Sequence, residues 1–128
     1  MTLPDPPTYP IDERESGTYS ATIVGNDGVT PLPGSTLSTL TLTLYVIKQD
    51  GTEEVVNGRN QQNVLNANNV TVSEAGALVW SVRPLDTIIV ESFLPVERHI
   101  ALFEWTWPTG NAGKHEFVAA VRNLRRVS

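Results

Sequence analysis

Cysteine is absent from the 128-residue sequence, and this absence removes several classes of protein. Without thiols the chain cannot have a disulfide framework, a cysteine-ligated zinc or a thiol nucleophile. Long hydrophobic runs are also absent, since none approaches the roughly 18 residues that a membrane-spanning helix needs. The N-terminal stretch is rich in proline and has no apolar core, which is not the pattern of a signal peptide. We therefore expect no membrane partner.

Basic residues are scarce and unevenly placed. Nine Lys and Arg face 14 Asp and Glu, giving a net charge of −5, which argues against nucleic acid as a partner. The last seven residues nevertheless include Arg122, Arg125 and Arg126, so the rest of the chain carries −8. A basic tail on an acidic body predicts contact with an acidic neighbour, including a second copy of this chain. A solvated tail is the alternative.

Catalytic motifs are missing as well. The sequence has no G-x-S-x-G motif to mark a nucleophilic serine. Glu53 and Glu54 are adjacent carboxylates, but in a strand they would point to opposite faces and could not act as an acid–base pair. We expect no catalytic residues and therefore a non-enzymatic protein.

The two histidines are the remaining candidates for a metal site. If their strands pair as a hairpin centred near Asn111, His115 lies opposite Trp107 and His99 lies opposite Asn123. The histidines would then be separated by about eight residues, roughly 26 Å at a rise of ~3.3 Å per residue. Two ligands that far apart cannot share an ion, so we expect neither a metal site nor a cofactor.

Alternating hydrophobic and polar residues dominate the remaining sequence. In residues 38–48, Leu40, Leu42, Leu44 and Val46 alternate with threonines and a tyrosine, which predicts a half-buried strand. The same signals, separated by Gly- and Pro-rich turns, predict further strands at 18–24, 53–56, 70–72, 77–82, 97–107 and 115–123. About seven to eight short strands without helical periodicity indicate an all-β, antiparallel β-sandwich, with a small barrel as the alternative.

The tryptophans divide into core and surface candidates. Trp80 and Trp105 lie within predicted strands, and we expect them in the core. Trp107 ends its strand beside a Pro-Gly loop, and it is the aromatic residue we select as a partner contact.

Three regions follow from these patterns. Residues 1–15 are predicted to be an extended, Pro-rich N-terminal arm, residues 16–124 the sandwich, and residues 125–128 a basic tail. In the arm, Tyr9 and Pro10 are the candidate contacts with a neighbouring subunit. A disordered terminus is the alternative.

Three stretches of the sequence carry a resemblance to a known group of proteins. They are SATIVGNDGVTPLPGSTLSTLTLTLY, NGRNQQNVLNANNVTVSEAGALVWSVRPLDT and ERHIALFEWTWPTGNAGKHEFVAAVRNL. Together they resemble small virion proteins of tailed phages and the N-terminal module of the baseplate upper protein family. The resemblance covers about residues 16–124, and it implies an Ig-like β-sandwich with a structural or docking role.

The resemblance sets the functional expectation. The chain would be a virion protein, made in the host cytoplasm, that serves as a capsid decoration, neck or tail subunit. Its partners would be other virion proteins and a second copy of itself, bound through the sandwich surface and the terminal segments. A carbohydrate- or host-receptor-binding module of a tail or fibre is the alternative, with Trp107 and residues 57–69 as its surface.

Overall fold

The computed structural model describes residues 8–108 and 110–124, and in this part of the chain the protein is all-β. Its strands are β1 (Thr8–Asp12), β2 (Gly17–Thr22), β3 (Thr39–Ile47), β4 (Glu53–Val55), β5 (Gln62–Asn63), β6 (Val70–Val72), β7 (Ala77–Val82), β8 (Val96–Trp107) and β9 (Asn111–Arg122). Two single-turn 3₁₀ helices, η1 (Gly34–Thr36) and η2 (Pro84–Thr87), interrupt them.

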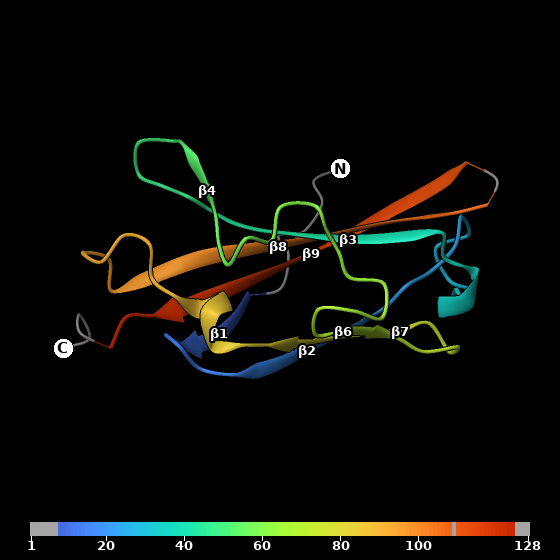
Figure 1. Cartoon of the computed structure of the whole chain (residues 1–128), viewed down its shortest axis with the longest axis horizontal. Coiled ribbons are helices and arrows are strands. Elements are labelled where there is room, and N and C mark those ends of the chain that lie inside the picture. The colour runs from blue at the N-terminus through green and yellow to red at the C-terminus, as the bar shows by residue number, and fades with distance from the viewer. Residues whose placement is uncertain (1–7, 109, 125–128) are drawn as a thin grey trace.

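Two sheets pack face to face, so the predicted β-sandwich is confirmed (Figure 1). The larger sheet has the order β1-β9-β8-β3-β4, with β5 also paired to β3, and the smaller sheet has the order β2-β7-β6. The described residues contain nine strands rather than seven or eight, because β1 and the two-residue β5 were not predicted.

The core lies between the sheets. Every second residue of β3 from Leu40 to Val46 is buried, while the intervening side chains face outward, as the alternation predicts. Trp80 of the smaller sheet contacts Phe103 of the larger one edge-to-face, with ring centroids 5.7 Å apart. Trp80 and Trp105 are both buried, which confirms their placement in the core.

The β8–β9 hairpin differs from its predicted register. Trp107 pairs with Asn111 and Phe103 pairs with His115, so the prediction that His115 faces Trp107 is wrong. The turn closes at Gly110, whose φ of +78° suits glycine, and the strand therefore resumes at Asn111. The histidines are consequently about four residues apart along the ladder, or roughly 13 Å rather than 26 Å.

Part of the segment predicted as an arm belongs to the larger sheet. Residues 8–12 form β1, which runs parallel to β9 with Thr8 opposite Val118 and Asp12 opposite Arg122. Proline is tolerated in β1 because the strand lies at the sheet edge. Ile11 is buried in the shared core, so β1 contributes to the packing of the sandwich. Residues 1–7 lie outside the described residues.

Candidate interaction surface

A groove of about 410 Å³ crosses the outer face of the larger sheet, and we call it the outer groove. Outward-facing side chains of β3, β8 and β9 supply its apolar floor: Ile47, Val96, Ile100 and Val118. Ile47 is 56% exposed and Val96 47%, whereas Val118 is almost fully covered. A concave apolar floor on the outside of a sheet is a surface suited to a partner.

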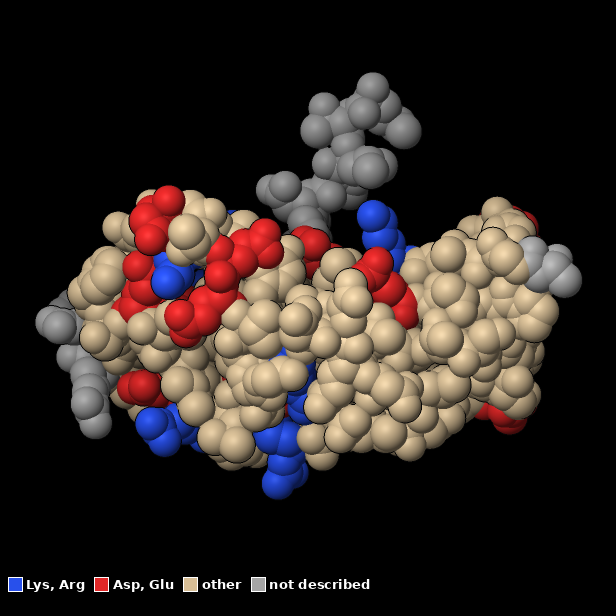
Figure 2. Space-filling model, turned by 45° about the horizontal axis from the view of Figure 1, so that its top comes forward, with Lys and Arg blue, Asp and Glu red and all other residues tan. Residues whose placement is uncertain are grey.

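Acidic side chains surround this floor. Glu91 and Glu116 line the outer groove, and Arg98 contributes a cation. Figure 2 shows Asp and Glu side chains gathered at the left end of the molecule, where Figure 1 places β4 and the loop before β8. Burial raises the pKa of Tyr45, and the negative charges of Glu116 and Glu53 raise it further. The outer groove therefore lies in a negative region.

The edge formed by β1 and β9 brings together three of the predicted contact residues. Tyr9 and Pro10 pair with Ala119 and Ala120, and Arg122 ends β9 beside Asp12. The Arg122 Nε donates to Asp12 Oδ1 at 2.6 Å. This hydrogen bond holds the pKa of Asp12 below its usual value and the pKa of Arg122 above its own. Arg122 is thus paired within its own chain.

The other predicted contacts lie elsewhere. Trp107 is at the far end of β8, about 11 residues or ~36 Å along the ladder from the position paired with Arg122. Its side chain is half-buried and packs against the core, so only part of the ring is available to a partner. Arg125 and Arg126 lie outside the described residues.

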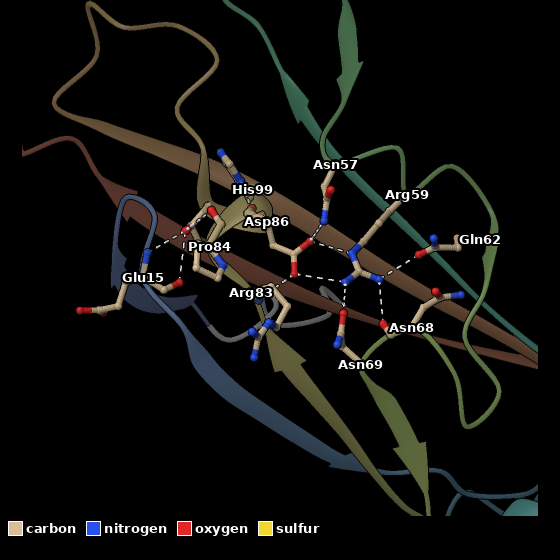
Figure 3. A network of polar contacts seen from close by, with 11 residues as sticks. Glu15, Asn57, Arg59, Gln62, Asn68, Asn69, Arg83, Pro84, Asp86 and His99 are labelled. Atoms are coloured by element: carbon tan, nitrogen blue, oxygen red, sulfur yellow. Dashed lines mark hydrogen bonds and ion pairs between the residues drawn. The ribbon is translucent and has the colours of Figure 1, made fainter.

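A buried ion pair, not anticipated from the sequence, fixes the Asn-rich loop between β4 and β6. Arg59 Nε donates to Asp86 Oδ1 at 2.7 Å, and both side chains are almost fully buried. The remaining guanidinium donors reach Asp86 Oδ2, Gln62 Oε1, Asn68 O and Asn69 Oδ1 (Figure 3). All five N–H groups of Arg59 therefore have acceptors, which offsets the cost of burying the charge.

Asp86 is equally well partnered. Its Oδ1 also accepts from Asn57 Nδ2 at 2.8 Å, and its Oδ2 accepts from the backbone N–H of Arg83 at 2.9 Å. The second contact caps η2, so one carboxylate joins this turn to the loop that contains Arg59. The pair has a structural role, because it ties a long polar loop to the sandwich.

A second polar pair continues from η2 to the outer groove. His99 Nδ1 lies 2.9 Å from Asp86 O, and its Nε2 lies 2.7 Å from Glu97 Oε1. Each ring nitrogen of His99 therefore faces an oxygen atom inside the protein. The two oxygens of Glu97 accept the backbone N–H groups of Val90 and Glu91, at 2.8 and 2.7 Å. Burial opposes ionisation of Glu97, but these hydrogen bonds outweigh it and lower its pKa.

Glu97 therefore positions one wall of the outer groove. The loop of residues 88–95 is held to β8 through its carboxylate, and Glu91 in turn accepts the backbone N–H of Gln49 at 3.1 Å. The groove is thus preformed by hydrogen bonds inside the chain. The sequence does contain a signal for this pair. The alternation of β8 places Glu97 and His99 on the same inward face as the core residue Phe103.

The described residues hold no group of three or more His, Cys, Asp or Glu side chains placed to bind a metal ion. In the same ranges, 8–108 and 110–124, no helix has the length and apolar character needed to cross a membrane. No family model matches the chain, and no match was found among curated proteins.

Proposed function

We propose that the chain is a non-enzymatic structural protein of a tailed-phage virion, an Ig-like module that serves as a capsid decoration, neck or tail subunit. It acts by binding neighbouring virion proteins through its surface and terminal segments. The proposed class of particle is based on the resemblance of residues 16–124 to small virion proteins. The outer groove is the observation that carries the adhesive role.

The shape and rigidity of the outer groove support a docking function. Its apolar floor offers area that a partner can cover, and Ile47 and Val96 are the most exposed parts of that floor. Its wall is fixed by the hydrogen bonds of Glu97, so little conformational entropy is lost on binding. A preformed apolar surface with a charged rim is the usual composition of a protein–protein contact.

Mass spectrometry of purified particles tests the proposal. The protein should be present in a fixed ratio to the major capsid or tail protein, and electron microscopy of the particles should locate it. Its absence from purified particles, with all of it free in the lysate, would overturn the proposal.

A matched pair of variants tests the surface. Ile47→Lys places a charge on the groove floor and should reduce incorporation into particles at least about tenfold, because its ammonium must be desolvated in the contact. Val29→Lys makes the same change at a residue that is 75% exposed and lies outside the groove. Incorporation of the Val29 variant should stay at the wild-type level. Equal incorporation of both variants would exclude the outer groove as the contact.

A further inference from the structure

The residues that line the outer groove indicate the kind of side chains that would bind in it. The lining includes the carboxylates of Glu91, Glu97 and Glu116 and the guanidinium of Arg98. Glu97 is already paired with His99, which leaves two carboxylates facing one cation at the rim. Covering the apolar floor supplies affinity, while cations beside the carboxylates supply orientation and a faster association. A short segment with both apolar and basic side chains fits this chemistry.

The C-terminus of this chain is such a segment. Residues 124–128 read Leu-Arg-Arg-Val-Ser, so two guanidiniums lie between two apolar side chains. The body that would receive them has a net charge of −8 over residues 1–121. Charge complementarity therefore favours this tail as the occupant.

The departure of the chain from β9 favours the tail of a second copy. Leu124 N donates to Glu13 Oε1 at 3.0 Å, and Glu13 N donates to Arg122 O, so the backbone is held on the β1 side of β9. The outer groove extends from Glu116 and Val118 of β9 across β8 to Ile47 of β3, away from β1. At Leu124, the last described residue, the backbone is therefore held toward β1.

The tail nevertheless begins at the same end of the molecule as the groove. Asn123 Nδ2 donates to Ser92 O and to Leu94 O, each at 3.0 Å, and Leu94 lines the outer groove. Phe93 and Leu124 are both more than half exposed at this end. Two copies that meet there bring each tail to the other copy's groove and cover these apolar side chains.

We propose that two copies of the chain exchange residues 124–128, each tail lying in the outer groove of the other copy. The contact is reciprocal, so it closes a two-fold dimer rather than building a filament. Arg125 and Arg126 approach Glu91 and Glu116, and the apolar residues of the tail cover the groove floor. This inference rests on the adhesive function proposed above and names one partner for it.

Sedimentation equilibrium of the full chain tests the dimer. The wild type should be a dimer that dissociates on dilution and on raising the salt concentration. Reversing the tail charges with Arg125→Glu and Arg126→Glu should weaken the dimer at least about tenfold. The groove variant Glu91→Lys with Glu116→Lys should do the same. The control Glu74→Lys with Glu104→Lys makes the same charge change outside the groove and should leave the dimer intact.

Mixing the tail and groove variants gives the decisive measurement. Each variant alone opposes like charges, whereas a mixed pair places an acidic tail in a basic groove and a basic tail in an acidic groove. The mixture should therefore form a one-to-one dimer at concentrations where each variant alone is a monomer. A mixture that stays monomeric overturns the exchange. Wild-type chains that stay monomeric, with a tail protected from protease at every dilution, identify the chain's own tail as the occupant.

The outcome for the tail can be separated from the outcome for the virion. A monomeric wild-type protein that is still found in purified particles discards the tail exchange and leaves the proposed function standing. A dimer with the expected charge dependence that is absent from particles keeps the exchange and discards the virion assignment.

Discussion

Glu97 shows how one buried side chain organises a surface. Only 3% of the residue is exposed, yet its carboxylate is held by His99 and by two backbone amides of the preceding loop. A buried carboxylate is tolerable when it is paired and its lone pairs are filled. The same contacts fix the wall of the outer groove, so the stability of this pair and the shape of the docking surface are linked.

We predict that Glu97→Gln lowers the free energy of unfolding at pH 7 by about 1–3 kcal/mol, because the amide NH₂ of glutamine cannot accept a buried hydrogen bond that the carboxylate accepts. The pKa of Glu97 is lowered in the folded state, so its stabilisation is complete above the unfolded-state pKa and is lost as pH falls through the folded-state pKa. Urea unfolding at several pH values should therefore show the variant and the wild type converging in acid. Glu53→Gln, at an exposed site, should change stability by less than about 0.5 kcal/mol. Equal stability of Glu97→Gln and wild type at pH 7 would contradict this reading.

The burial of single residues could be predicted where they belong to a regular alternation of apolar and polar residues. The leucines of β3 and the core tryptophans follow from alternation, which needs no knowledge of distant partners. Arg59 and Asp86 lie in loops without periodicity, and they are separated by 27 residues, so their pairing required the fold itself. Residue type and local sequence do not identify which polar groups meet across a sandwich.

At the scale of elements, β1 joins the N-terminal segment to the sandwich. Its five residues pair with β9 along their whole length, and Ile11 reaches the shared core with 7% of its surface exposed. A detached arm would leave the sandwich unaffected by changes in this segment, whereas an edge strand would not.

We expect Ile11→Ala to lower the free energy of unfolding by about 2–4 kcal/mol, because it removes buried methyl groups and leaves a cavity. Urea unfolding followed by tryptophan fluorescence measures the effect on the free chain. Val29→Ala, at a highly exposed position, is the control and should stay within about 0.5 kcal/mol of wild type. A neutral Ile11→Ala would show that β1 adds no stability and acts only as an arm.

The strands that could be predicted are those with regular alternation and clear turns. β3, β6 and β7 agree with their predicted ranges to within one residue at each end. β1 was missed because its proline argued for an unpaired extension, although an edge strand accepts proline. The predicted register of β8 and β9 was wrong because the Pro-Gly loop contains fewer residues than its composition suggested. The sequences of two strands do not by themselves define which residues pair.

At the scale of the whole molecule, the candidate surface depends on features that no single segment carries. The outer groove needs β3, β8 and β9 in register and the 88–95 loop folded over them, so sequence reasoning did not find it. The predicted contacts Tyr9, Pro10 and Arg122 do meet at one edge, because β1 pairs with β9. Trp107 lies at the opposite end of the hairpin, and the roles of Arg125 and Arg126 stay predictions.

The two sheets share one aromatic cluster, which makes them a single cooperative unit. Tyr19 and Trp80 of the smaller sheet contact Phe103 and Phe117 of the larger sheet, with ring centroids 5.7–5.8 Å apart. A three-stranded sheet that loses this cover exposes its apolar face, so it should not persist alone.

We therefore predict one unfolding transition for the whole chain. Replacing Trp105 and Trp107 by Phe leaves Trp80 as a reporter of the smaller sheet, while Trp80→Phe leaves two reporters on β8 of the larger sheet. In each variant, the urea midpoint from fluorescence should coincide with the midpoint from far-ultraviolet circular dichroism. Trp80→Phe should also lower stability by about 1–3 kcal/mol through the volume it removes. Separate midpoints, with the smaller sheet melting first, would mean that the sheets are only loosely coupled, and a docking surface on the larger sheet would then not need the smaller one.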